Sequence, residues 1–176
     1  WDRESISFRP NKIGHGTNDT VPVNVSASES GITLRHGEHA GRLVMPVRVQ
    51  LQNGPEFNED REEYWQYHYN TSIHSDDGGT TWQVGEPVQS GTGEGTLAEL
   101  SDGRLYYNSR SHMSVDHRRR LAWSHDGGYR WVDWEVSEDL LEIGGPHYYR
   151  YGSRPSYGCN SGLVRLPDDV APCEDA

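Results

Sequence analysis

The fold is decided by a motif that occurs twice. It reads Ser75-Asp76-Asp77-Gly78-Gly79-Thr80-Thr81-Trp82 in one place and Ser124-His125-Asp126-Gly127-Gly128-Tyr129-Arg130-Trp131 in the other. Both copies follow β-like segments, residues 67–74 and 121–123. Aspartate at such a turn accepts backbone N–H bonds, and paired glycines allow positive φ. We therefore predict two β-hairpins, with the tryptophan of each folded under its turn.

The residues that define the motif are predicted to be structural. They are Ser75, Asp77, Gly79 and Trp82 in the first copy, and Ser124, Asp126, Gly128 and Trp131 in the second.

A second repeat runs out of phase with the first. Short apolar strands are expected at 31–34, 95–100 and 162–166, where Leu34, Leu100 and Leu166 are spaced 66 residues apart. The first two lead through polar turns into strands at 42–47 and 104–107. One unit is thus strand, turn, strand, excursion and Asp-Gly-Gly hairpin. This pattern is typical of a four-stranded antiparallel blade, and stacked blades form a propeller. Only residues 137–143 resemble a helical turn.

The predicted fold class is all-β, a partial β-propeller of about two complete blades and two incomplete edges. The first complete blade spans about 28–82, the second about 93–131, and a third begins over 159–176. Residues 1–19 have no blade to join. Closed propellers need about four to eight blades, so we expect the chain to be part of a larger protein. Open blade edges invite pairing, which makes the rest of the propeller or a second copy candidate partners.

Composition excludes several classes of function. The net charge of −11 disfavours nucleic acid, and no apolar run approaches the ~18 residues of a membrane span. Lys12 is the only lysine among 16 basic residues, so bidentate arginine donors dominate. Cys159 and Cys173 form either one disulfide or two inert thiols. No cofactor or metal is expected. His36 and His39 are the closely spaced histidines considered as metal ligands, and they lie in a predicted turn.

One hairpin carries a candidate chemical site. Asp102-Gly103 forms its turn, and Glu94 and Arg110 each lie 8 residues from Asp102. An antiparallel ladder then brings their side chains together on one face at the open end, unless a bulge intervenes. In the inner strands of a propeller, that end faces the central funnel. The pair suits a charged ligand, although a plain cross-strand salt bridge is equally consistent with the spacing.

Other polar and aromatic stretches have simpler interpretations. Residues 118–120, three arginines, are predicted to lie on an exposed strand where alternate side chains face water. The acidic loop 56–63 is most simply a solvated excursion between strands, and the alternative is a loop that covers a ligand site. Tyr64, Trp65, Tyr67 and Tyr69 are of a kind that stacks on sugars, but packing between blades is the favoured interpretation for Trp65, Tyr67 and Tyr69.

Together these motifs resemble the sialidase (neuraminidase) family. The repeated turns are similar to its Asp-boxes, and Gly31–Gly37 followed by Gly41–Pro46 resembles the blade after the first of them. Glu94 through Arg110 resembles the segment with the catalytic glutamate and the second arginine of its carboxylate-binding cluster. Gly158–Gly162 is similar to its Gly-Cys-Gln-Gly-Ser turn. The resemblance covers residues 28–166.

The resemblance implies a six-bladed propeller that removes terminal sialic acid from glycoconjugates. A tyrosine attacks the anomeric carbon in this family, which departs from the usual two-carboxylate scheme, and a glutamate is its base. The resemblance assigns the base to Glu94, one carboxylate-binding arginine to Arg110 and a substrate contact to Asn160. For Arg48 it leaves two alternatives, a substrate contact or a side chain that points outward. A sialylated glycan or other anionic sugar is the implied partner, and a secreted or periplasmic location is favoured.

Other family features have no match in this chain. There is no Phe/Tyr-Arg-Ile-Pro motif; the acid/base aspartate, the other two arginines and the nucleophilic tyrosine fall in family regions without a counterpart here. The context of Tyr148, Tyr149, Tyr151 and Tyr157 does not fit the nucleophile. We therefore expect the chain by itself to be inactive. The alternative is a non-catalytic Asp-box propeller that binds carbohydrate or protein.

Overall fold

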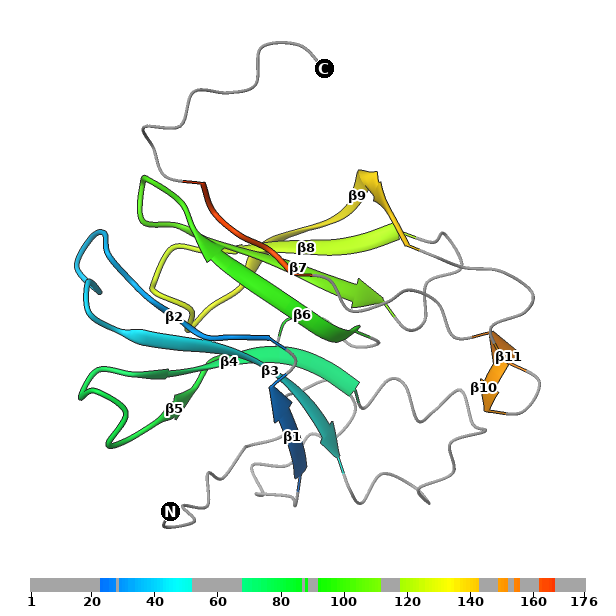
Figure 1. Ribbon diagram of the computed structural model, residues 1–176, viewed down its shortest axis with the longest axis horizontal. Coiled ribbons are helices and arrows are strands. Elements are labelled where there is room, and N and C mark those ends of the chain that lie inside the picture. The colour runs from blue at the N-terminus through cyan, green and yellow to red at the C-terminus, as the bar shows by residue number, and fades with distance from the viewer. Residues whose placement is uncertain are drawn as a thin grey trace.

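Two antiparallel sheets pack against each other in the computed structural model (Figure 1). The structure describes residues 23–27, 29–51, 68–86, 88, 92–111, 118–142, 149–151, 154–155 and 162–166. These residues form strands and turns and no helix, so none of them belongs to a helix that could span a membrane. The expected all-β class is confirmed.

The first sheet contains five strands. They are β1 (Val23–Ala27), β2 (Ile32–Thr33), β3 (Leu43–Leu51), β4 (His68–Ser75) and β5 (Gln83–Val84). Both β1 and β2 pair with β3, β4 pairs with the other side of β3, and β5 pairs with β4. The sheet thus has the expected blade order, with β1 as an additional strand that the sequence pattern did not predict.

A proline explains why two short strands share one side of β3. β2 pairs with Leu43 and Val44, whereas β1 pairs with Val47 through Leu51. Pro46 lies in the gap between the two registers and has no N–H to donate to a ladder. The position beside β3 on this side of the sheet is therefore shared by two short strands, β1 and β2.

The second sheet is a regular four-stranded meander. Its strands β6 (Thr92–Glu99), β7 (Leu105–Ser111), β8 (Arg118–Ser124) and β9 (Val132–Leu141) are adjacent in chain order. The helical turn predicted at 137–143 is wrong as far as Leu141, because Ser137 through Leu141 continue β9. Irregular pairing between β8 and β9 accounts for the misleading pattern, since register shifts break the period of two.

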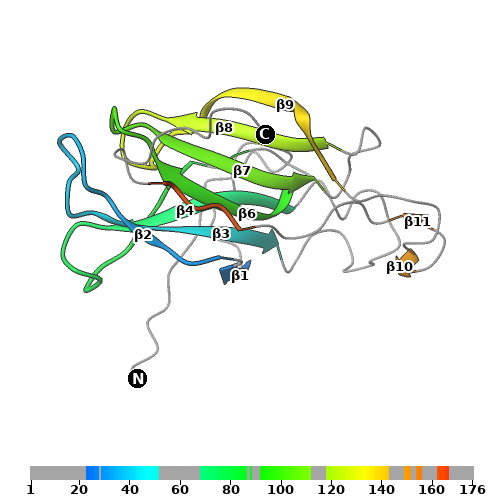
Figure 2. The same ribbon diagram turned by 45° about the horizontal axis from the view of Figure 1, so that its top comes forward.

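Two further segments belong to neither of these sheets. β10 (Tyr149–Tyr151) and β11 (Arg154–Pro155) form a small antiparallel pair. Residues 162–166, predicted as a strand, form no ladder with other described residues; they run beside β6 in both views (Figure 2). The proposed blade boundaries stay predictions. Outside the described residues lie the segments 1–19 and 56–63, and also Tyr64, Trp65, Tyr67, Cys159 and Cys173.

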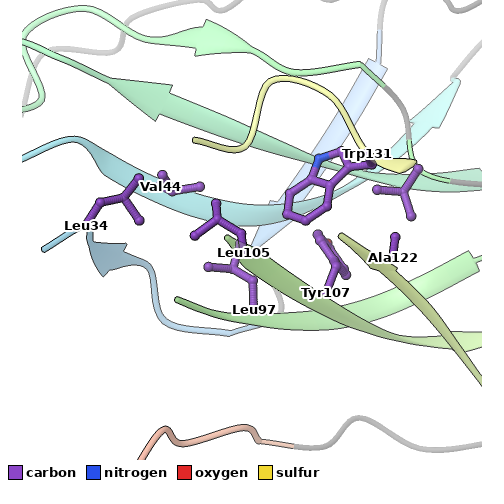
Figure 3. Packing of buried hydrophobic residues seen from close by; sticks show 8 residues of the cluster. Leu34, Val44, Leu97, Leu105, Tyr107, Ala122 and Trp131 are labelled. Atoms are coloured by element: carbon purple, nitrogen blue, oxygen red, sulfur yellow. The ribbon is translucent and has the colours of Figure 1, made fainter. Parts of the chain in front are cut away.

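The main core lies between the two sheets (Figure 3). Its members come from both sheets and are almost fully buried: Leu34, Val44, Val88, Leu97, Leu105, Tyr107, Ala122 and Trp131. Tyr107 and Trp131 meet edge to face with centroids 4.8 Å apart, a favoured geometry for aromatic rings. Large rings thus fill a core that has few aliphatic side chains.

A second apolar cluster covers the other face of the first sheet. Val47, Tyr69 and Ile73 are buried there, with Trp82 packed against them. Tyr69 is therefore buried on the face of the first sheet that points away from the second, and its packing between blades stays a prediction.

The two Asp-Gly-Gly turns share the hydrogen bonds from serine to aspartate and from the second glycine to serine. In the first, Ser75 Oγ accepts from the N–H of Gly79 at 2.8 Å and donates to Asp77 at 2.7 Å. The glycines have φ of 71° and 93° in the first turn and 69° and 93° in the second, values that favour glycine. Trp82 donates to the carbonyl of Gly79 at 3.0 Å, which folds the ring under its turn as predicted.

The two turns are joined by one arginine. Arg42 binds both carboxylate oxygens of Asp76, at 2.7 and 2.9 Å. Its Nη1 donates to the carbonyls of Asp126 and Gly127, at 3.1 and 3.2 Å. In addition, Trp131 of the second sheet donates to Ser72 of the first at 3.3 Å. These hydrogen bonds therefore fix the orientation of the two sheets relative to each other. That orientation determines how side chains from the two sheets meet.

Candidate functional site

The side chains of Glu94 and Arg110 meet at one end of the second sheet. Gly95 pairs with Ser109 in the β6–β7 ladder, so continuing the register by one residue sets Glu94 opposite Arg110. Arg110 Nη1 lies 2.7 Å from Glu94 Oε2. The bulge between Thr92 and Gly95 does not separate them. The approach predicted from the spacing is confirmed.

A second guanidinium reaches the same carboxylate from the first sheet. Arg48 Nη1 lies 3.6 Å from Glu94 Oε1, so each oxygen of Glu94 faces one arginine. The side chain of Arg110 is 9% exposed, whereas those of Glu94 and Arg48 are 22% and 27% exposed. The three side chains thus form a partly open ionic cluster at the junction of the sheets. Two positive charges therefore attract the one carboxylate.

Close backbone contacts place this cluster. A Cβ on Gly95 would collide with the Tyr107 ring and lie 2.8 Å from Asn70 Nδ2, so only glycine lets β6 approach the first sheet here. Asn70 Nδ2 in turn donates to Ser109 Oγ at 2.5 Å, and the Asn70 N–H donates to Thr92 Oγ1 at 3.0 Å. These contacts flank Glu94 and Arg110 on both strands.

A buried ion pair lies next to Arg110 and was missed from the sequence. Arg119, predicted to lie on an exposed strand, is only 5% exposed, and Glu142 is 7% exposed. Their Nη1 and Oε1 atoms are 3.2 Å apart. Burial lowers the pKa of Arg119 and raises the pKa of Glu142, so each charge depends on the other. Arg118 and Arg120 are half-buried. Burial therefore alternates along the three arginines as predicted, but none of the three side chains is fully exposed to water.

The β7–β8 register places Arg119 next to Arg110. Ser109 pairs with Arg120 across β7 and β8, and one further residue sets Arg110 opposite Arg119. Glu142 had no comparable signal, because the register shifts between β8 and β9 hide its position.

A cavity of about 510 Å³ opens away from this cluster. Its lining includes Arg35, His36, Glu99 and Arg165, and none of Glu94, Arg110 and Arg48. Glu99 lies at the opposite end of β6 from Glu94 and accepts the N–H groups of Arg35 and His36, at 2.8 and 2.9 Å. Since that carboxylate joins the two sheets, we assign Glu99 a structural role.

Two buried tyrosines are poorly suited to nucleophilic attack. Burial raises the pKa of Tyr69 to about 12 and raises the pKa of Tyr107 as well. The Tyr107 hydroxyl also donates to the carbonyl of Thr71 at 3.3 Å. Neither residue therefore supplies an easily ionised phenol. Asn160, Tyr148 and Tyr157 lie outside the described residues.

We find no metal-binding site in the part of the chain that the structure describes. His36 and His39 lie in the turn between β2 and β3, as expected. No group of three or more His, Cys, Asp or Glu side chains is placed to hold an ion among the described residues.

Comparison with known proteins gives partial matches. The chain is 37% identical over 115 residues to a sialidase of Micromonospora viridifaciens, which covers 65% of this chain and 16% of that protein. It is 35% identical over 101 residues to a sialidase of Clostridium perfringens, covering 57% and 22%. The chain thus spans less than a quarter of the length of these curated relatives. No model of a known protein family matches it.

The fold has a counterpart among solved structures. The intramolecular trans-sialidase of Ruminococcus gnavus, in complex with oseltamivir carboxylate, superposes with a TM-score of 0.51 and 23% identity. The match covers 66% of this chain and 21% of that one, and it supports the interpretation of the two sheets as blades of a partial β-propeller. Over 115 and 101 residues, the chain is thus similar in sequence to two curated sialidases.

Proposed function

We propose that the protein is an exo-α-sialidase-type glycoside hydrolase, of which this chain supplies part of the catalytic domain. The observation that carries the proposal is the cluster in which Glu94 contacts Arg110 at 2.7 Å and Arg48 at 3.6 Å. The names of the similar proteins support the reaction class. The proposed substrate is a glycan with a terminal sialic acid.

The chemistry of that substrate explains the residue types. Sialic acid carries a carboxylate on its anomeric carbon, which would repel a carboxylate nucleophile. A neutral phenol avoids the repulsion, but with a pKa of about 10 it needs an adjacent base. We assign that role to Glu94, whose ionised carboxylate would accept the phenolic proton. The tyrosine would come from outside the described residues.

Arg110 is proposed to bind the substrate carboxylate. Its planar guanidinium is suited to bidentate contact with a carboxylate, and its side chain is held in place by burial. Arg48 is proposed to add a second positive charge beside the same ligand. Asn160 remains a proposed substrate contact. These cations create a local attraction in a protein whose net charge of −11 would otherwise repel an anionic sugar.

The proposal is tested by hydrolysis of a fluorogenic α-sialoside. The full-length protein that contains this chain should release the fluorophore, and Glu94→Gln should lower kcat/KM by about 100-fold or more, the usual range for loss of a general base. Glu99→Gln is the matched control, because it neutralises a buried carboxylate at the other end of the same strand. Residues 1–176 by themselves should be inactive.

Two outcomes would contradict the proposal. Glu94→Gln with parental activity would remove Glu94 from the mechanism. A full-length protein that binds sialyllactose without hydrolysing any sialoside would favour a non-catalytic carbohydrate-binding propeller instead.

A further inference from the structure

One row of charged side chains crosses three strands of the second sheet. Continued by one residue beyond Gly95–Ser109 and Ser109–Arg120, the registers set Glu94 of β6 opposite Arg110 of β7, at the bulge, and Arg110 opposite Arg119 of β8. Directly opposed residues in an antiparallel ladder share a face. Glu142, beyond the end of β9, contacts Arg119 and completes the row. The order of charges is negative, positive, positive, negative.

The two central arginines would repel each other without the outer carboxylates. Like charges directly opposite on a sheet are destabilising, and burial increases the effect. Electrostatic interaction with Arg110 is among the causes that lower the pKa of Arg119. Glu142 offsets the charge of Arg119, and the side chain of Glu142 is only 1% exposed. Glu142 also interacts favourably with Arg110, so the two outer carboxylates together balance the charges of the two arginines.

The same pair also contacts the backbone segment that carries Arg110. Arg119 Nε donates to Asn108 Oδ1 at 2.6 Å, and its Nη2 donates to the Asn108 carbonyl at 3.4 Å. Glu142 Oε2 accepts the N–H of Ser111 at 3.4 Å. Asn108 and Ser111 lie on either side of Arg110 in β7. A displacement of the pair would therefore displace Arg110.

We propose that Arg119 and Glu142 are positioning residues, which hold the Arg110 guanidinium against Glu94 in the geometry that receives a substrate carboxylate. The inference rests on the proposed function for its substrate. It assigns neither residue a direct contact with that substrate. Because a carboxylate clamp binds ground state and transition state alike, disturbing Arg110 should raise KM and leave kcat nearly unchanged.

The variants below separate an effect on the position of Arg110 from a general loss of protein stability. Removing one partner leaves a buried charge uncompensated, whereas replacing both with apolar residues is often neutral for folding. The double variant Arg119→Met/Glu142→Leu leaves no unpaired buried charge, so it should be destabilised less than either single variant, although Asn108 and the Ser111 N–H lose these hydrogen bonds. In the full-length protein it should raise KM for a fluorogenic sialoside about 10-fold, since small displacements of a positioned group cost at least that much. Glu99→Gln should leave KM unchanged.

A second variant covers the case in which the double variant fails to fold. Arg119→Lys keeps the charge and can still contact Glu142, but it lacks the planar donor set that holds Asn108. It should fold and raise KM by several-fold. A folded double variant, or a folded Arg119→Lys variant, with the parental KM would overturn the inference.

A nuclear magnetic resonance readout keeps this result separate from the proposed function. The Nε–Hε signal of Arg110, assigned by its loss in Arg110→Lys, should shift in the Arg119 variants and stay in place in Glu99→Gln. If no sialoside is hydrolysed, the proposed function fails while a shifted signal still supports positioning. An unshifted signal in every folded variant would contradict it.

Discussion

Arg110 Nη1 lies 2.7 Å from Glu94 Oε2 although sixteen residues separate the two along the chain. The tight Asp102-Gly103 turn accounts for the approach: Gly103 has a φ of 85°, and Asp102 accepts the N–H of Arg104 at 3.0 Å. The register then carries through β6 and β7 to the open end. Turn geometry at one end of a hairpin thus creates a charge pair at the other.

Arg110→Lys should weaken sialoside binding while the protein stays folded. Lysine keeps the charge but cannot form the planar bidentate contact. Loss of one charge-assisted hydrogen bond, worth about 1.5–3 kcal/mol, predicts a rise in KM of about 10-fold or more. Steady-state kinetics of the full-length protein measure the effect. Arg104→Lys, at an arginine 44% exposed that pairs with Asp102, is the control. An equal KM in both variants would count against a role for Arg110.

Gly95→Ala should damage the site through packing. The new Cβ would lie 2.8 Å from Asn70 Nδ2 and collide with the Tyr107 ring. Overpacking of this kind costs about 1–3 kcal/mol, and the strand that carries Glu94 must shift. We expect a lower denaturation midpoint together with reduced kcat/KM.

The control for this substitution is Gly162→Ala, where a Cβ meets no atom within 4 Å. Parental stability in Gly95→Ala would show that the two sheets do not approach as closely as described.

The fold was largely predictable because its turns repeat. Asp77 and Asp126 mark two hairpins whose hydrogen bonds depend on residues only a few positions apart, so local sequence determines them. The division beside Pro46 was not predicted, because it depends on which strands lie next to β3. The same holds for Arg119 and Glu142: their burial depends on packing and on an irregular β8–β9 register, which three consecutive arginines do not indicate.

Arg42→Ala should destabilise the protein more than removal of an exposed arginine. Arg42 is 10% exposed on its side chain and joins Asp76 to two carbonyls of the second turn. Losing hydrogen bonds to a charged group in this setting costs about 1–3 kcal/mol of unfolding free energy. Urea denaturation gives the comparison with Arg104→Ala, for which about 0.5 kcal/mol or less is expected. Equal losses would show that Arg42 does not join the sheets.

Asp77 should make stability depend on pH in the acid range. Hydrogen bonds from the Thr81 hydroxyl and N–H and from Ser75 lower its pKa from 3.8 to about 2. Because the folded pKa lies below the unfolded one, this contribution is present above pH ~4 and is lost as the pH falls toward ~2. Unfolding midpoints between pH 5 and pH 2 should fall less steeply in Asp77→Asn than in the parent. Asp139→Asn, at an exposed carboxylate on β9, should behave as the parent does. Parallel curves for all three proteins would rule out the Asp77 contribution.

A crystal structure of the full-length protein with a sialic acid glycal bound tests the role of the Glu94–Arg110–Arg48 cluster most directly. We predict that the ligand carboxylate lies about 3 Å from the Arg110 guanidinium, with Glu94 and Arg48 beside the same ligand. A ligand bound elsewhere, or Glu94 and Arg110 turned to different surfaces, would contradict the assignment of this cluster as the sialic acid site.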